Sequence, residues 1–214
     1  MKMKQIFFIL FIFQCFFLFA TAQFPDVLIY NGKKYALTVN PMEIFFEKFP
    51  EKRPEMPHTG LWRGYIATFE IIDNELWVID IVKCESVFDN GNFVFKYISI
   101  INDCLDGKNR MKIDWFNGLL VLPQGDILNY VHMGYASTYE YYTIMEIQEG
   151  NYIKELNMDY TKYIEFKENQ FEHYKKTESY KKLFERLNDG NMVEDEIENF
   201  LRIFIIEYSE KIYE

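Results

Sequence analysis

Apolar residues follow one period before residue 160 and another period after it. Between residues 27 and 158 they alternate with polar residues or form short runs, separated by turn sequences such as Asn31-Gly32 and Asp73-Asn74. This pattern is typical of β-hairpins. After residue 160 they recur at helical spacing, with Lys and Glu between them. A sheet followed by helices predicts an α+β fold, with about eight or nine strands in a largely antiparallel sheet.

The strand-forming half divides into hairpins. Leu61–Cys84 carries apolar residues on both faces, which predicts strands that are central in the sheet or covered on both sides. Leu119–Leu122 is expected to end at Pro123-Gln124-Gly125. The predicted strands are Val27–Tyr30 with Lys34–Val39, the two halves of Leu61–Cys84, Phe93–Ile101, Ile113–Phe116 with Leu119–Leu122, and Thr138–Ile147 with Tyr152–Met158.

Three helices are predicted. Asn40 is expected to cap a short N-terminal helix, with Pro41 at its first position and Pro50 at its end. Two amphipathic helices are expected at the C-terminus, on Phe171–Leu187 and Val193–Ile212, separated by Asp189-Gly190-Asn191.

The N-terminus has the pattern of a secretory signal peptide. Lys2 and Lys4 precede an apolar stretch, Ile6–Phe19, and Ala20-Thr21-Ala22 supplies the small residues that signal peptidase recognises. A spanning helix needs roughly 20 apolar residues, more than this stretch offers. We therefore expect residues 1–22 to be removed, leaving a periplasmic or secreted protein with one domain over residues 23–214 and no membrane span. An uncleaved N-terminal anchor is the alternative.

Charge narrows the class of partner. The chain has 23 Lys and Arg against 33 Asp and Glu, and the loss of Lys2 and Lys4 brings the net charge to about −12. Such a charge repels the phosphates of nucleic acids and steers basic proteins toward the chain. A basic protein is therefore the expected partner, and nucleic acid is not expected.

Two cysteines, Cys84 and Cys104, remain after processing. In an oxidising compartment they could form a disulfide between neighbouring strands, and buried free thiols are the equal alternative. The many Phe and Tyr residues are expected mainly in the core, with an aromatic binding groove as the alternative.

The segment from Tyr130 to Glu140 carries the first candidate site. His132 is a candidate general base, with Glu140, Tyr135 or Asp126 as its neighbour. The alternative is a turn at Gly134 with His132 in a structural role.

Trp62-Arg63-Gly64-Tyr65 is the second candidate. An arginine between two aromatic residues can bind a carboxylate or stack on a ring, so Arg63 and Trp62 are candidate binding residues. The alternative is that Arg63 pairs with an acid of its own fold.

The common catalytic signatures are missing from the sequence. It has no G-x-S-x-G, no Walker A loop and no G-x-G-x-x-G, and its three histidines lie far apart without H-E-x-x-H or Cys-x-x-Cys. We therefore expect neither a metal site nor a bound cofactor.

Three segments together resemble a group of uncharacterised exported bacterial proteins. They are Trp62–Ile71, Trp115–Gly125 and His132–Glu140, and the group shares the patterns W-R-G-Y-x-A-x-x-E-I and H-M-G-Y-x-S-x-Y-E. The resemblance covers about residues 27–140. It implies a bacterial source and one continuous domain, and it implies no known activity.

These observations favour an envelope binding or interaction protein without catalysis. One version is an immunity-like protein that neutralises a basic toxin, because the acidic chain would attract a cationic partner. The alternative is a hydrolase-like enzyme that uses His132 with Glu140, Tyr135 or Asp126, and Arg63 as an anion anchor. The alternative requires these side chains to converge in one pocket.

Overall fold

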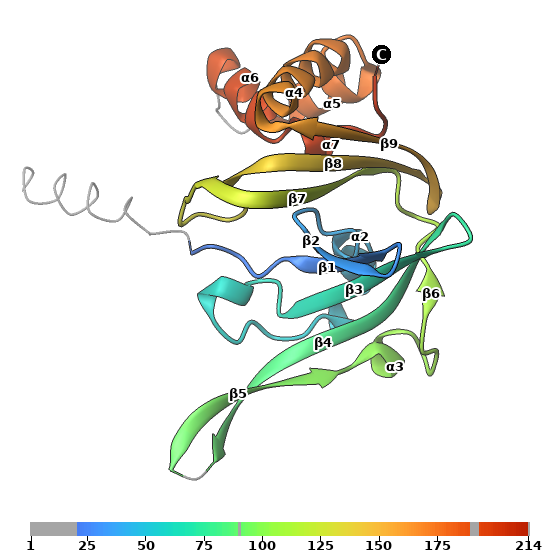
Figure 1. Cartoon of the computed structure of the whole chain (residues 1–214), viewed down its shortest axis with the longest axis vertical. Coiled ribbons are helices and arrows are strands. Elements are labelled where there is room, and N and C mark those ends of the chain that lie inside the picture. The colour runs from blue at the N-terminus through green and yellow to red at the C-terminus, as the bar shows by residue number, and fades with distance from the viewer. Residues whose placement is uncertain (1–20, 90, 189–192, 214) are drawn as a thin grey trace, which may run out of the picture.

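One large, mostly antiparallel sheet organises the chain (Figure 1). The computed structural model describes residues 21–89, 91–188 and 193–213, so nearly all of the expected signal peptide lies outside the described residues. Nine strands in the described part run in the order β2-β1-β3-β4-β9-β8-β7, with β5 and β6 paired to β4 beside this path. The strands are β1 (Asp26–Tyr30), β2 (Lys33–Leu37), β3 (Tyr65–Ile72), β4 (Glu75–Asp89), β5 (Asn92–Ser99), β6 (Met111–Lys112), β7 (Gly118–Asn129), β8 (Thr138–Gln148) and β9 (Asn151–Asp159).

Helices gather at the C-terminal end of the chain, which confirms the predicted α+β fold class. No helix among the described residues is long and apolar enough to span a membrane. The helices are α2 (Glu43–Lys48), the 3₁₀ turns η1 (Pro50–Lys52) and η2 (Thr59–Leu61), α3 (Ile101–Cys104), α4 (Tyr160–Tyr174), α5 (Glu178–Asn188), α6 (Glu194–Ile203) and α7 (Ile205–Tyr208).

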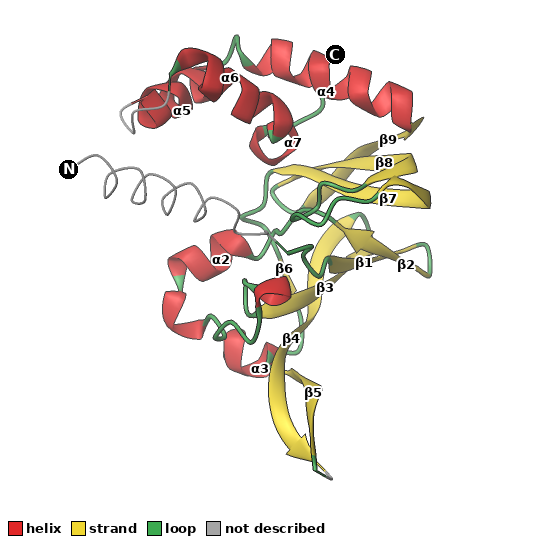
Figure 2. Cartoon of the chain, turned by 90° about the vertical axis from the view of Figure 1, so that its left-hand side faces the viewer, coloured by secondary structure: helices red, strands yellow, loops and turns green. Residues whose placement is uncertain are grey.

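Strands β7–β9 form a middle layer between the C-terminal helices and strands β1–β4 (Figure 2). The two-residue period of a strand gives this layer two apolar faces. On β7, Leu120 and Leu122 pack into the core shared with β1–β4, while Leu119 and Val121 pack against the helices. Tyr142 of β8 also faces the helices and stacks on Tyr163 of α4, with ring centroids 3.9 Å apart.

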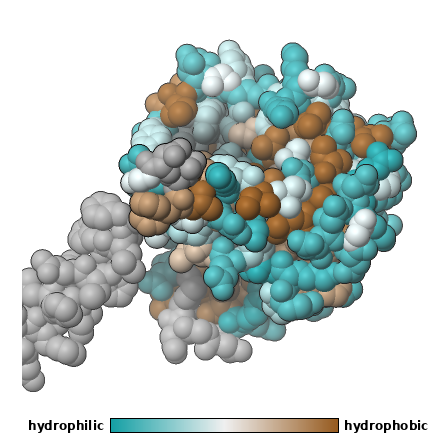
Figure 3. Space-filling model, turned by 90° about the horizontal axis from the view of Figure 1, so that it is seen from below, coloured by the Kyte–Doolittle hydropathy of each residue, from teal (hydrophilic) through white to brown (hydrophobic). Residues whose placement is uncertain are grey.

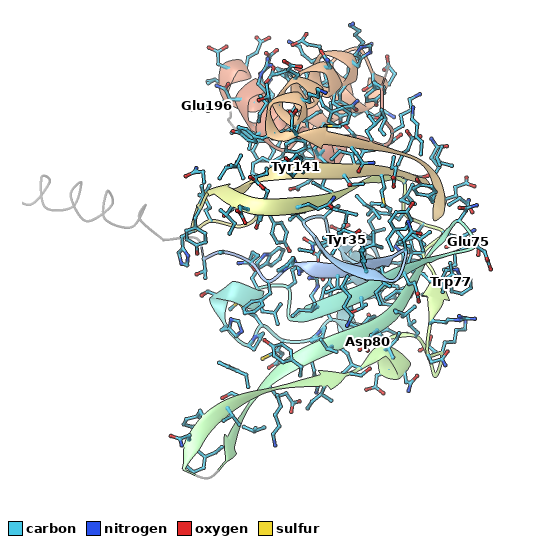
Figure 4. All side chains as sticks on the ribbon, in the orientation of Figure 1. Tyr35, Glu75, Trp77, Asp80, Tyr141 and Glu196 are labelled. Carbon is cyan, nitrogen blue, oxygen red and sulfur yellow. The ribbon has the colours of Figure 1, made fainter. Side chains whose placement is uncertain are left out.

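The two halves of the sheet are joined at both sides. On one side β4 pairs with β9 at Glu75 and Asn151 (Glu75 is labelled in Figure 4). On the other side the Thr38 N–H donates to the Val121 carbonyl over 3.2 Å. These links enclose the first core, into which α2 also inserts Phe45 and Phe46.

The hairpins at Asn31-Gly32 and Asp73-Asn74 form as predicted, with Asn31, Gly32, Asp73 and Asn74 all in the left-handed backbone region. The predicted pairing of Ile113–Phe116 with Leu119–Leu122 is wrong. The Ile113 N–H donates to the Leu76 carbonyl at 3.0 Å, so this segment crosses from β4 toward β7. The Asn117 side chain accepts the Glu149 N–H at 2.8 Å, away from any turn with Gly118.

Strand β7 also continues through Pro123, where we expected it to end. Pro123 lies opposite Tyr142 of β8, and the register shifts only beyond Gln124. Because β7 is the last strand of the sheet order, a proline that lacks an N–H is tolerated there.

Each predicted C-terminal helix is divided in two. Thr177 separates α4 from α5, since its hydroxyl accepts the Tyr180 N–H at 3.1 Å and so starts a new helix. The second predicted helix is divided at Phe204, between α6 and α7. The predicted cap of α2 is wrong, because its N-cap is Met42 and the Asn40 side chain binds elsewhere.

Candidate functional site

Arg63 and Tyr135, from two separate candidate segments, meet in the folded protein. Arg63 follows η2, and Tyr135 lies in the connection from β7 to β8. One guanidinium nitrogen of Arg63 donates to the Tyr135 hydroxyl, and the other donates to the Phe24 carbonyl at 2.9 Å. The Tyr135 hydroxyl in turn donates to the same carbonyl over 3.2 Å.

Asp26, which the sequence analysis missed, is the acid that pairs with Arg63. Its Oδ1 lies 3.2 Å from Arg63 Nη2, and both side chains are almost completely buried. The carboxylate also accepts the Ala67 N–H at 2.9 Å and the Asn40 amide at 3.1 Å. A signal existed in the sequence, because Asp26 stands two residues before Leu28 and so on the core face of β1.

Burial sets the titration of this cluster. It raises the pKa of the Asp26 carboxyl to about 6, although Arg63 and the Ala67 N–H favour the charged form. Burial acts to lower the pKa of Arg63, but Asp26 and Tyr135 outweigh it and the pKa is raised. Burial also raises the pKa of Tyr135.

The contacts of the Arg63 cluster (Asp26, Asn40, Arg63 and Tyr135) indicate a structural role. The guanidinium lies 5.4 Å from the ring centroid of Tyr65 and 5.9 Å from that of Tyr135. Its Nε is buried without a partner in the described part of the chain. Because Arg63 is only 1% exposed, a ligand at the surface does not reach it in this arrangement.

His132, Glu140 and Asp126 do not gather around one pocket. His132 is exposed, and its Nδ1 lies 2.9 Å from the Tyr130 hydroxyl. Glu140 accepts the Asp126 N–H at 3.0 Å instead of facing His132. Glu140 also fills the space beside Gly125, where an added Cβ would lie 2.5 Å from its Oε2.

Two clefts in the described surface lie away from these residues. The larger, of about 550 Å³, is lined mainly by α5 and the segment Glu207–Glu210. The smaller, of about 280 Å³, lies between α2 and the connection from α3 to β6. Neither His132, Arg63 nor Trp62 lines either cleft.

The β4–β5 hairpin projects from the rest of the molecule (Figure 1) and carries exposed aromatic rings. Phe88, Phe93, Phe95 and Tyr97, here called the aromatic stripe, are 67%, 77%, 57% and 50% exposed. Figure 3 views this end of the molecule and shows apolar patches among polar residues. Protein surfaces rarely leave several large apolar side chains together in water without a binding role.

The aromatic stripe continues toward the N-terminal segment. The ring of His58 lies 5.3 Å from that of Phe95 and 5.8 Å from that of Phe24. Trp62 is exposed nearby in the chain, and its backbone N–H donates to the Gln23 side-chain oxygen at 3.4 Å. Of the two candidate binding residues, Trp62 is therefore at the surface and Arg63 is not.

Cys84 and Cys104 are both buried free thiols in this structure. Cys84 lies opposite Tyr97 in the β4–β5 pair, and the Cys104 thiol lies 3.9 Å from the Lys52 carbonyl oxygen. No group of three or more His, Cys, Asp or Glu side chains in the described ranges is placed to hold a metal ion.

Comparison of the chain with known protein families, with curated proteins and with solved structures finds no match.

Proposed function

We propose that this chain is a non-catalytic binding protein, exported to the bacterial envelope, that recognises an extended strand of a partner protein along the outer edge of β5. The supporting observation is the exposed aromatic stripe beside an unpaired strand edge. Strand β5 pairs with β4 on one side only, and no other described strand pairs with its other side.

The hydrogen-bond alternation of an antiparallel pair identifies the free groups. The Ile100 N–H donates to the Ile81 carbonyl at 2.8 Å, so Ile100 faces β4. By the two-residue alternation, the backbones of Phe93, Phe95 and Tyr97 face outward. These residues supply unpaired N–H and C=O groups together with the exposed rings. An added strand uses both, since main-chain bonds give affinity and side-chain contacts give specificity.

Charge on the hairpin is balanced, so the expected partner segment is one with alternating apolar side chains. Lys83 and Glu85 form an ion pair at 2.6 Å, and Lys96 lies opposite Glu85. At the other end of the molecule, the first turn of α6 carries Glu194, Asp195 and Glu196 (Glu196 is labelled in Figure 4), a local acidic group that would attract a basic protein. In one version of this proposal the protein is immunity-like and its partner is a basic protein. Association with such a partner is expected to be faster at low salt than at moderate salt.

A hydrolase centred on His132 is the weaker candidate. His132 contacts Tyr130, whereas Glu140 accepts the Asp126 N–H. His132 also lies outside both clefts described above. General base catalysis requires the base to reach the reacting group within hydrogen-bond distance in a site that also holds the substrate.

The test is capture of a partner from an envelope extract with a variant that changes only the edge. Phe93→Lys combined with Phe95→Lys places charges on the edge, a device that natural edge strands use against pairing. The control is Ile203→Lys, the same kind of change at an exposed position of α6. We expect one partner to be captured by the unchanged protein and by the control, and to be lost with the double variant.

Hydrogen exchange on the complex then reports the mode of binding. We expect slower exchange at the amides of Phe93, Phe95 and Tyr97 when the partner is bound. The proposal is overturned by capture that the double variant leaves unchanged, or by no capture at low and moderate salt. Self-association that the double variant abolishes would also overturn it, because the occupant of the edge would then be a second copy.

A further inference from the structure

The smaller cleft combines an apolar floor with a basic rim. It has a volume of about 280 Å³ and lies between the α2–η1 segment and the connection from α3 to β6. Phe45, Phe49, Leu105, Met111 and Trp115 supply the floor. This site lies outside the β4–β5 hairpin and does not depend on the function proposed above.

The floor is held in shape by aromatic contacts. The ring centroids of Phe45 and Phe49 are 5.1 Å apart, and those of Phe45 and Trp115 are 5.8 Å apart. The Trp115 indole N–H donates to the Pro41 carbonyl over 3.5 Å. A preformed apolar floor favours a ligand with an apolar body, because little ordering is needed on binding.

The rim carries three lysines and one acid. Lys52 is already occupied, since its ammonium lies 2.6 Å from Asp106 and 3.0 Å from the Cys104 carbonyl. Lys48 and Lys108 are exposed and have no acidic partner among the described residues. The rim is thus locally positive in a chain whose net charge is −10. Lys48 also lies over the ring of Phe49, 5.4 Å from its centroid. Two ammonium groups without an acidic partner, beside an apolar floor, fit an amphipathic anion.

We propose that this cleft binds a medium-length acyl carboxylate, with its chain on the apolar floor and its carboxylate at Lys48 and Lys108. The volume of the cleft limits the length of the acyl chain that it can hold. A methylene group takes about as much room as a water molecule, roughly 30 Å³, so the cleft holds roughly nine such groups. Octanoate and decanoate match this length.

The experiment titrates decanoate, below its micelle concentration, into protein with ¹³C-labelled methionine methyl groups. We expect a saturable shift of the Met111 methyl signal, because Met111 lines the cleft. The exposed Met56, which does not line the cleft, serves as the internal reference and is expected to stay in place. Decanol has the same chain without the carboxylate and therefore tests the contribution of the ligand's charge. We expect decanol to bind about tenfold more weakly than decanoate.

Two double variants of matched chemistry complete the test. We expect Lys48→Gln with Lys108→Gln to weaken decanoate binding about threefold to tenfold, the range for two partly exposed charge contacts. Lys33→Gln with Lys34→Gln, at exposed positions of β2, is expected to leave it unchanged. The proposal is overturned by no saturable shift at Met111, by equal shifts at Met56, or by decanol binding as tightly as decanoate. Equal losses in both double variants would also overturn it, since only the overall charge would then matter.

Discussion

Arg63 and Asp26 form a buried ion pair, with 3.2 Å between Nη2 and Oδ1, at the point where three segments of the chain meet. Asp26 begins β1, Arg63 precedes β3, and Tyr135 comes from the β7–β8 connection. The N-terminal segment joins them through the Phe24 carbonyl. A single cluster of charge-assisted hydrogen bonds thus links the two halves of the sheet.

Removal of the cation is expected to destabilise the fold strongly. Arg63→Met keeps an unbranched apolar stem but removes the guanidinium, which leaves Asp26 buried without its counter-charge. Breaking a buried pair in this way costs about 3–5 kcal/mol of unfolding free energy. Urea unfolding at pH 7 measures the change. Lys34→Met, the same type of substitution at an exposed position, is the control and is expected to stay within about 0.5 kcal/mol. A loss below about 1 kcal/mol for Arg63→Met would contradict a role of this pair in stability.

The raised pKa of Asp26 predicts an unusual pH dependence. The pKa is about 6 in the folded protein against an ordinary value of 3.8, because of burial. Between these values the folded state binds the proton more tightly than the unfolded state. The stability that this group contributes is therefore fully present below about pH 4 and is lost as the pH rises through 6.

Asp26→Asn isolates this contribution, because asparagine has nearly the same shape and does not titrate. We expect the unfolding free energy of the unchanged protein, minus that of Asp26→Asn, to fall between pH 4 and pH 7. The fall is at most about 3 kcal/mol, since one pKa unit corresponds to about 1.4 kcal/mol. Urea unfolding of both proteins at four pH values measures it. A difference that rises with pH would show that Arg63 outweighs burial and lowers the pKa of Asp26.

Gly64 is expected to tolerate no side chain. Its φ is +84°, and an added Cβ would lie 2.2 Å from the Pro54 carbonyl oxygen. Gly107 has a similar φ of +87° but open space around it. Both Gly64→Ala and Gly107→Ala therefore place an alanine at positive φ, which costs about 1 kcal/mol of backbone strain. Only Gly64→Ala also brings the new Cβ into a clash with the Pro54 carbonyl oxygen. We expect Gly64→Ala to lose at least about 2 kcal/mol more stability, by urea unfolding. Equal losses would mean that the loop at Pro54 moves away freely.

The sequence predicts those parts of the fold that local chemistry decides. Asn31-Gly32 and Asp73-Asn74 form turns because residues of this kind accept the left-handed backbone that such hairpins need. Long-range contacts decide the rest. Asn40 has the local features of a helix cap, but its amide binds Asp26 and Tyr135, which are distant in the sequence.

Long-range contacts, which the sequence does not reveal, also decide the candidate site. The sequence singled out Arg63 and Tyr135 and offered an internal ion pair as one interpretation. The spacing of Asp26 from Leu28 is the one local signal for this residue among 33 acids, and it does not indicate which cation Asp26 pairs with. The sequence also could not show that the aromatic residues of β5 are exposed. Their apolar pattern is that of a buried strand, and the rings are exposed because no other described segment covers the face of β5 that carries them.

Both cysteines are expected to be free thiols that react slowly in the native protein because they are buried. Cys84 and Cys104 are 5% and 2% exposed, and burial raises the pKa of Cys104 to about 11, which suppresses its reactive thiolate. In protein without residues 1–22, a thiol reagent at pH 8 should react slowly with the native state and rapidly with two thiols in urea, with no reductant added. Cys104→Ser should reduce the count in urea to one. A count of zero in urea that rises to two only after reduction would mean that the cysteines are joined in a disulfide.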